Sequence, residues 1–174
     1  MGPNSAFAAV ALPHLDAAHN LARWLTGSAE EAEDVVQEAM VRALTYFPGF
    51  RGDNARAWIL QIVRNAAYAA LKARAQRKAV PLAEDAEDGG APPLADPGDD
   101  PERALIRTRE RKRLDTLLDR LPVELREALV LRELEEMSYR DIARVTGTPI
   151  GTVMSRLWRA RRMLLRAAGK GMAP

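Results

Sequence analysis

Residues 139–162, "YRDIARVTGTPIGTVMSRLWRARR", concentrate guanidinium groups in one short stretch. The stretch holds six arginines and one acidic residue. Arginine side chains bind phosphate oxygens and the edges of bases, so the chemistry that this segment could perform is the binding of nucleic acid. The alternative is a solvated helix surface, although such surfaces usually carry charges of both signs.

The same stretch has the pattern of a helix-turn-helix. Ala143 and Gly147 are small residues at the spacing that lets two helices cross closely and gives the turn a residue that tolerates positive φ. Thr148 is placed to cap the second helix, and Pro149 suits its first turn. We therefore expect two helices joined by a tight turn at Gly147.

The second helix of this pattern has an apolar face and a cationic face. At about 100° per residue, Val153, Leu157, Ala160 and Leu164 fall on one side, which we expect to be buried. The opposite positions are small or polar first and cationic later: Gly151, Ser155, Arg159, Arg162 and Arg166. Such a helix suits the major groove, where its first side chains reach bases and later ones meet phosphates. A short helical hairpin with a basic surface would give the same pattern.

Residues that could perform catalysis or hold a metal are not grouped in this sequence. The two histidines, His14 and His19, have no metal-ligand companions, and the chain contains no cysteine. The sequence shows no nucleophile–base arrangement and no phosphate-binding glycine loop. We therefore expect no enzymatic activity, no cofactor and no metal site.

Composition and hydropathy favour a cytoplasmic globular protein. Apolar residues make up 47% of the 174 residues, enough to form hydrophobic cores. The absence of cysteine suits a reducing compartment. The longest apolar runs are too short to span a membrane, and the N-terminus lacks the pattern of a secretion signal, so we expect no membrane insertion.

Charge is unevenly distributed along the chain, although the formal net charge is only +2. Residues 1–78 have a net charge of +2, residues 79–102 of −8 and residues 103–174 of +8. Residues 79–102 also contain five prolines and three glycines, so they cannot continue a helix or form a core. They are predicted to be a flexible acidic linker, and the basic C-terminal part is typical of a nucleic-acid-binding domain.

The first block, before the linker, shows helical periodicity and no β-strand alternation. Gly27 ends one predicted helix, and Ser28 begins the next in a capping box with Glu31. The apolar stripe of this next helix comprises Ala32, Val35, Val36, Ala39, Met40, Ala43, Leu44 and Phe47. The sequence "FRGDN" is then expected to be a loop before a third, long helix.

The second block is also predicted to be helical, so the expected fold class is all-α. Its helices are expected to begin near Arg103 and to continue over "PVELREALVLREL", "SYRDIARVTG" and "PIGTVMSRLWRARRMLLRAA". The predicted architecture is two small helical bundles, residues 10–78 and 103–168, joined by the linker at residues 79–102.

The two blocks together resemble a known family. The motifs "AEDVVQEAMVRAL" and "FRGDNARAWILQIVRNAAYAALK" resemble region 2 of bacterial sigma factors of the sigma-70 family. The segment "LPVELREALVLRELEEMSYRDIARVTGTPIGTVMSRLWRARRML" resembles their region 4. No recognisable region 1 or region 3 precedes or separates them, which is the layout of the extracytoplasmic-function (ECF) sigma factors. The resemblance implies a factor that binds core RNA polymerase and directs it to promoters.

The resemblance implies a polymerase-binding face on the helix that contains "DVVQE". In the family this helix docks on the clamp helices of the polymerase β′ subunit, and the family also implies contact with the β flap. The residues assigned to the face here are Asp34, Gln37, Glu38 and Val41. From the residues alone, the polar members would be interpreted as a solvated surface opposite the apolar stripe.

The resemblance also implies that region 2 holds one strand of the melted promoter −10 element. The residues assigned to this strand are Phe50, Arg51, Gly52, Asp53, Asn54, Gln61, Asn65, Lys72 and Arg74. Amide side chains such as Gln61 and Asn65 can pair with a flipped base, and basic side chains can meet phosphates. Core packing is the alternative role for Phe50, and we interpret Trp58 as a core residue.

Region 4 of the family reads the −35 element as duplex DNA. The matching positions here are Thr148, Pro149, Ile150, Gly151, Thr152, Ser155, Arg156, Arg159 and Arg162. Arg156 lies beside the predicted buried stripe, which leaves its target open. Arg162 is expected to meet phosphate rather than a base, because it lies far along the helix.

Members of the family are commonly restrained by an anti-sigma factor, often membrane-bound, and the resemblance implies such a partner here. Two other protein classes fit part of the pattern. A two-domain helix-turn-helix repressor would explain the basic C-terminal block, but it would not need the polar "DVVQE" face or the −10-type loop. A protein-interaction scaffold would explain the helical blocks, and a salt-dependent DNA-binding assay would distinguish it.

Overall fold

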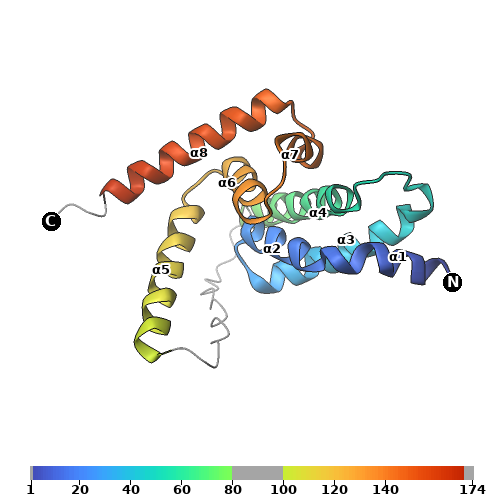
Figure 1. Ribbon diagram of the computed structural model, residues 1–174, viewed down its shortest axis with the longest axis horizontal. Helices are drawn as coiled ribbons and strands as arrows, with labels where there is room; N and C mark the ends of the chain where they lie inside the picture. The colour runs from blue at the N-terminus through green and yellow to red at the C-terminus, as the bar shows by residue number, and fades with distance from the viewer. Residues whose placement is uncertain (1, 80–99, 171–174) are drawn as a thin grey trace.

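The computed structural model describes residues 2–79 and 100–170, and every regular element in these ranges is helical. The first range contains α1 (Pro3–Ala11), α2 (Leu15–Thr26), α3 (Ala29–Tyr46) and α4 (Ala55–Lys78), with 3-10 turns at Leu12–His14 and Phe47–Gly49. The second contains α5 (Pro101–Asp119), α6 (Val123–Leu129), α7 (Tyr139–Thr146) and α8 (Ile150–Lys170), with a π-helical turn at Val130–Leu134. The all-α prediction is confirmed (Figure 1).

The two helical blocks extend slightly beyond the ranges predicted for them. Helix α1 begins before residue 10, where the first block was predicted to start. Its Phe7 ring packs edge-on against Phe47 with centroids 5.5 Å apart. Its alanine-rich sequence lacks the polar–apolar periodicity that would have revealed a helix. Residues 80–99, most of the predicted linker, lie outside the described residues, and α5 already begins at Pro101 behind the capping side chain of Asp100.

Helices α2, α3 and α4 form a three-helix bundle (Figure 1), and many of its buried side chains are small. The fully buried alanines of these helices are Ala18, Ala22, Ala39, Ala43, Ala57, Ala66 and Ala67. Leu21, Leu60 and Val63 fill the space between the helices and are fully buried. The predicted stripe of α3 is confirmed except for Leu44, which is 39% exposed. Leu44 continues the edge of the stripe that Met40 occupies, and Met40 itself is only half-buried.

The corner between α2 and α3 forms partly as predicted. Gly27 ends α2 in the left-handed conformation with φ of 76°. The Ser28 hydroxyl accepts the N–H of Glu31 at 3.3 Å, which is one half of the capping box. The other half was predicted wrongly, because the N–H of Ser28 donates to the Thr26 hydroxyl at 3.3 Å. The Glu31 carboxylate instead accepts from Arg74 at 3.1 Å and thereby joins α3 to α4.

In the second block, α8 packs against α6 and α7 through its predicted apolar stripe. Val153, Leu157 and Ala160 are buried and Leu164 is half-buried, which confirms the predicted face. Gly147 ends α7 in the left-handed conformation with φ of 66°, as the turn requires. The predicted cap was wrong by one residue. Helix α8 begins at Ile150 behind the carbonyl of Pro149, and the Thr148 hydroxyl pairs instead with that of Thr146 at 2.8 Å.

Replacing Gly147 with alanine is expected to lower the free energy of unfolding by about 1 kcal/mol or slightly more. The reason is that a Cβ atom destabilises the left-handed conformation even where, as here, it would meet no neighbouring atom. Urea denaturation would measure the change. The matched control is Gly151→Ala, because Gly151 lies in α8 with open space around it and alanine there should stabilise the helix. Equal changes in both variants would contradict the assignment.

The two blocks also pack against each other. Helices α2 and α4 of the first block contact α6, and α4 contacts α7 (Figure 1). The π-helical turn is followed directly by Glu135, whose carboxylate reaches the first block. The next residue, Glu136, adopts a positive φ of 52°, which is uncommon for a residue with a side chain. The described parts of the chain therefore form a continuous helical body with an internal interface.

Candidate nucleic-acid interface

The helix-turn-helix presents the predicted ridge of α8 to solvent. Ala143 packs against the core, and its carbonyl accepts the N–H of Thr148 at 3.1 Å, which closes the turn before α8. The predicted reading residues that are exposed are Pro149, Ile150, Gly151, Ser155, Arg159 and Arg162. Thr148 and Thr152 are half-buried beside them. The ridge therefore has a small, polar start and a cationic continuation, which is the surface that a major groove accepts.

The arginines of α8 do not all point the same way. Arg159 and Arg162 are exposed, and the Arg162 guanidinium lies 4.5 Å from the centre of the Trp158 ring. Arg161 is drawn away from the ridge, because it donates to the Glu133 carboxylate at 2.7 Å. Arg161 was not among the residues predicted to form the ridge, and Arg159, Arg162 and Arg166, which were, are exposed.

Arg156 faces inward rather than along the ridge. Its Nη1 atom is buried and has no hydrogen-bond partner among the described residues. Burial raises the pKa of the Glu127 carboxyl on α6, and the charge of Arg156 is one of the smaller effects that lower it. The Arg156 guanidinium therefore lies close to that carboxylate. The sequence had placed Arg156 beside the buried stripe, and the structure confirms that placement. Its assignment to −35 DNA stays a prediction without support from the geometry.

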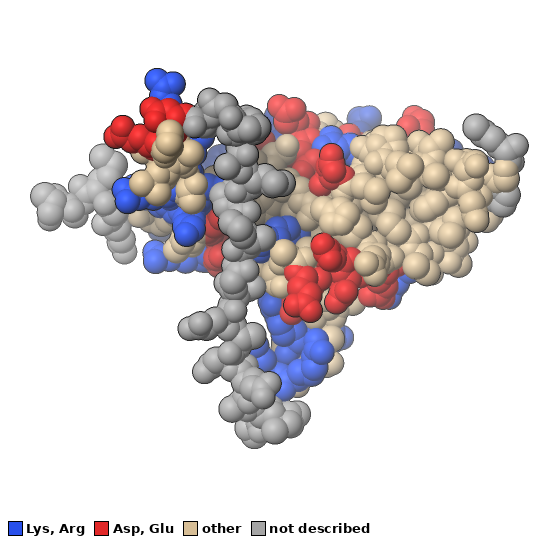
Figure 2. Space-filling view, turned by 90° about the horizontal axis from the view of Figure 1, so that it is seen from below, with Lys and Arg blue, Asp and Glu red and all other residues tan. Residues whose placement is uncertain are grey.

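Charge is unevenly distributed on one face of the molecule. In Figure 2 the end formed by α1 is largely uncharged, while basic and acidic side chains both lie away from that end. Exposed apolar side chains lie next to α1 and along α3: Leu12, Val41, Leu44 and Tyr46.

The loop between α3 and α4 is held by a row of aromatic rings. Phe47 stacks on Phe50 with centroids 6.4 Å apart, and Phe50 packs on Trp58 at 4.5 Å. Phe7 of α1 completes the row. A Cβ atom on Gly52 would lie 3.0 Å from the Phe50 ring, so glycine lets the loop fold over that ring. Trp58 is half-buried and packs against the core, as predicted. Phe50 is half-buried against the Trp58 ring, and its assignment to −10 DNA stays a prediction.

The polar residues after the aromatic row differ in what their side chains do. Asn54 caps α4, with its side-chain oxygen accepting the N–H of Ala57 at 3.0 Å. Gln61 is half-buried and Asn65, one turn later on α4, is exposed. Arg51, Gly52 and Asp53 are also exposed, with the Arg51 guanidinium donating to the carbonyl of Pro48 at 2.8 Å. The residues predicted to hold single-stranded DNA therefore lie along one loop and the adjoining face of α4.

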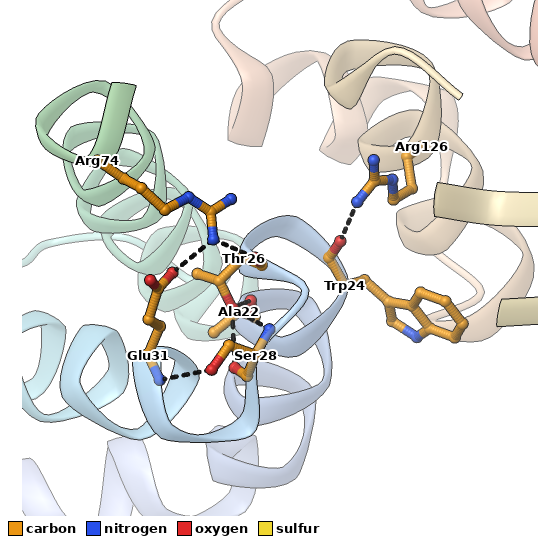
Figure 3. A network of polar contacts seen from close by, with 7 residues as sticks. All are labelled: Ala22, Trp24, Thr26, Ser28, Glu31, Arg74 and Arg126. Atoms are coloured by element: carbon orange, nitrogen blue, oxygen red, sulfur yellow. Dashed lines mark hydrogen bonds and ion pairs between the residues drawn. The ribbon is translucent and has the colours of Figure 1, made fainter. Parts of the chain in front are cut away.

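The two basic residues predicted beyond them have different surroundings. Lys72 is exposed. Arg74 instead donates to the carbonyl of Thr26 and to the carboxylate of Glu31, each at 3.1 Å (Figure 3). Arg74 therefore fastens the end of α4 to the corner between α2 and α3, a role that the sequence did not predict.

The outer face of α3 carries the residues predicted to bind polymerase. Asp34, Gln37 and Glu38 are exposed, and Glu38 forms an ion pair with Arg42. Val41 lies on the same face and is 66% exposed. Since α3 buries its opposite stripe, folding does not require these four side chains, and they form a continuous surface available to a partner.

Three acidic residues of the second block accept hydrogen bonds from side chains of the first block and were missed by sequence reasoning: Glu127, Glu135 and Asp141. Glu127 is fully buried and accepts from Arg64 at 2.7 Å and from the Tyr68 hydroxyl at 3.0 Å. Burial raises the pKa of the Glu127 carboxyl, and burial together with this carboxylate raises the pKa of Tyr68. The available signal was an acid within the apolar run "LREALVL", which predicts a buried charge that needs a partner.

Comparison with known proteins identifies both blocks. Residues 11–77 match the family described as Sigma-70 region 2, and residues 111–164 match Sigma-70, region 4. The chain belongs to the sigma-70 family of sigma factors. Proteins of this family are non-catalytic initiation factors that direct RNA polymerase to promoters, and a repressor is therefore not favoured. From here, region 2 denotes residues 11–77 and region 4 residues 111–164.

Curated relatives place this sigma factor in the ECF group. It is 41% identical over 142 residues to the RNA polymerase sigma-H factor of Pseudomonas aeruginosa, covering 80% of the chain and 74% of the relative. It is 37% identical over 137 residues to the ECF RNA polymerase sigma-E factor of Escherichia coli K12, covering 75% and 70% respectively. Both similarities extend across regions 2 and 4, in agreement with the predicted resemblance.

Solved structures share the arrangement of the helices. The sigma factor RpoE, in complex with the anti-sigma factor NepR from Bartonella quintana, is 28% identical, with a TM-score of 0.66 over 89% of this chain and 91% of that one. CnrH, in complex with the cytosolic domain of CnrY, is 24% identical, with a TM-score of 0.66 over 98% and 91%, and shows the same fold. Within residues 2–79 and 100–170 of this sigma factor, no helix is long and apolar enough to cross a membrane.

Proposed function

We propose that this ECF sigma factor reads the −35 element of its promoters with the exposed ridge of α8. The observation that supports this most directly is that Ser155 and Arg159 point outward behind the Gly147 turn while Val153 and Leu157 are buried. A helix held in this way can enter the major groove with its first turns. Arg159 has the reach for a bidentate contact with a guanine, and Arg162 lies further along, where phosphates are met.

We propose that region 2 holds the −10 element as a single strand over the α3–α4 loop and α4. The aromatic row holds the α3–α4 loop in place, and Gly52 and Asp53 of that loop are exposed to solvent. Gln61 and Asn65 are on one face of α4 and supply the amide groups that a flipped base needs. Lys72 continues this face as a phosphate contact.

We propose that the outer face of α3 docks on the β′ clamp helices of core polymerase, with region 4 contacting the β flap. Asp34, Gln37 and Glu38 lie within the two turns of α3 that precede the exposed Val41, so this face offers polar groups and an apolar side chain together, as protein interfaces do. The proposed activity places the protein in the cytoplasm with DNA and polymerase. An anti-sigma factor is the proposed regulator, since the relatives RpoE and CnrH were solved with NepR and CnrY.

Run-off transcription with purified core polymerase and a library of promoter sequences tests the proposed function. The expected result is transcription that depends on this chain and selects one −35 and one −10 sequence. Co-sedimentation with core polymerase measures binding of the chain to polymerase independently of transcription. A chain that binds DNA but neither sediments with polymerase nor supports transcription would be a repressor, and the proposal would be wrong.

Asn65→Ala is expected to reduce opening of the selected promoter and to change base preference within the −10 element. Loss of one base-pairing amide removes about 1 kcal/mol of binding energy, a factor of roughly five in affinity. Permanganate footprinting of the open complex on single-base −10 variants would measure the change. The matched control is Gln76→Ala, an exposed amide near the end of the same helix, which should leave −10 preference unaltered. Unchanged preference with Asn65→Ala would make Asn65 a surface residue without a base contact.

A further inference from the structure

The aromatic row connects helix α1 to helix α4 through the loop that we assign to the −10 strand. Phe7 of α1 meets Phe47 edge-on, with centroids 5.5 Å apart and ring planes at 72°. Phe47 stacks on Phe50 at 6.4 Å, and Phe50 packs on Trp58 of α4 at 4.5 Å. Two rings of the α3–α4 loop therefore lie between one ring from α1 and one from α4.

A 3-10 turn brings the two middle rings together. The turn covers Phe47–Gly49, and the N–H of Phe50 donates to the carbonyl of Phe47 at 2.9 Å. Side chains three residues apart eclipse in such a turn, so the sequence "FPGF" sets its two phenylalanines on the same side. Their ring planes are accordingly only 18° apart. The turn explains why Phe47 and Phe50 form a pair, but it does not fix where that pair lies on the molecule.

The two end rings hold the middle pair in place. Phe7 and Trp58 both pack against the hydrophobic core. Phe47 and Phe50 are half-buried, and their aromatic partners in the described part of the chain are the rings of this row. An aromatic pair contributes only modestly to stability, so a pair held from one side can shift more easily than a pair held from both. Helix α1 therefore supplies one of the two supports of the loop.

The ring of Phe50 lies directly against the backbone of the exposed part of the loop. A Cβ atom on Gly52 would be 3.0 Å from this ring. The neighbouring Arg51 guanidinium donates to carbonyls of the loop itself, those of Pro48 at 2.8 Å and Phe50 at 3.2 Å. A displacement of the Phe50 ring is therefore expected to move Gly52 and the residues beside it, which are the ones assigned to DNA.

We infer that Phe7 is a positioning residue for recognition of the −10 element: through Phe47 and Phe50 it holds the α3–α4 loop in the conformation that receives the strand. This inference rests on the proposed function of region 2. Phe7 is half-buried against the core, so it acts through the other rings and not by contact with DNA. It also lies before residues 11–77, the part of the chain that matches Sigma-70 region 2. The −10 site thus extends to a helix that the match to region 2 does not include.

Three single variants test this role without replacing any residue assigned to DNA or polymerase. Phe7→Leu removes the ring and keeps an apolar side chain against the core. Phe7→Tyr keeps the ring and is the conservative replacement. The matched control is Val10→Ala, which shortens another half-buried side chain of α1 that is not part of the row. Circular dichroism and the thermal midpoint of each variant show whether the fold is retained.

Selectivity is measured with the full chain and core polymerase, as the ratio of run-off transcript from the selected promoter to that from single-base −10 variants. We expect Phe7→Leu to lower this ratio about fivefold, the factor that corresponds to the loss of one aromatic pair. The same ratio for single-base −35 variants, and co-sedimentation with polymerase, should not change. In the free chain, amide exchange of residues 47–54 should become faster, because the loop opens more often. Phe7→Tyr and Val10→Ala should match the parent chain in every measurement.

Several outcomes would overturn the inference. An equal loss of −10 selectivity in Val10→Ala would assign the effect to α1 as a whole, and an equal loss in Phe7→Tyr would show that the ring is not what positions the loop. A parallel loss of −35 selectivity or of polymerase binding would indicate general damage to the fold. If Asn65→Ala alters −10 preference and Phe7→Leu does not, the proposed function stands and Phe7 serves folding alone. If neither variant alters it, the −10 assignment fails together with the inference.

Discussion

Replacing Asp34 and Glu38 together with arginine is expected to abolish binding of the chain to core RNA polymerase. Both side chains are exposed on the outer face of α3, and neither takes part in the core of region 2. Reversing two charges at a complementary interface sets like charges against each other and costs several kcal/mol, which is more than about a hundredfold in affinity. The one described contact that is lost, the Glu38–Arg42 ion pair, is exposed and contributes little to folding.

Co-sedimentation and run-off transcription with core polymerase would measure this loss. The matched control is Asp16→Arg with Glu124→Arg, which makes the same change of charge at exposed positions on α2 and α6. We expect the control to retain polymerase binding, and both double variants to keep their helix content and thermal midpoint within a few degrees. Normal transcription by the Asp34 and Glu38 variant would remove α3 from the polymerase interface.

The second large effect is expected on the sequence preference of α8. Arg159→Ala should relax selection within the −35 element, because a bidentate contact between arginine and a base discriminates by about 1–3 kcal/mol. Arg166 is also exposed, but it lies about 10 Å further along the axis, at about 1.5 Å per residue. Arg166→Ala should therefore weaken binding evenly across sequences, with a decrease of about one in the salt slope.

Duplexes with single-base changes in the −35 element, titrated with the full chain at two salt concentrations, would separate these effects. Arg166→Ala is the matched control for Arg159→Ala, since both remove one exposed guanidinium from the same helix. Arg161→Ala is a further control, because its guanidinium pairs with Glu133 and lies off the ridge. A shift of preference with Arg166→Ala and none with Arg159→Ala would mean that α8 docks in a different register.

Local chemistry explains why much of the site was predictable. The faces of α3 and α8 follow from the spacing of apolar residues, and Val153, Leu157 and Ala160 are buried as that spacing requires. The positive φ of Gly147 follows from the need to end α7 sharply. The order of the motifs was specific enough to indicate the family. Helix α1 escaped prediction because an alanine-rich segment has no polar face to mark its period.

The sequence by itself determined the helices, their apolar faces, the helix-turn-helix and the family, because each depends on residues within a few turns of one another. Only the tertiary structure decided which charged groups are paired. Arg156 and Arg161 resemble Arg159 in the sequence, yet one faces inward towards Glu127 and one pairs with Glu133. Arg74 fastens a helix corner, and Glu127 lies fully buried between the regions. Such pairings join residues 28 to 63 positions apart, and no local periodicity encodes contacts that form only when separate helices pack.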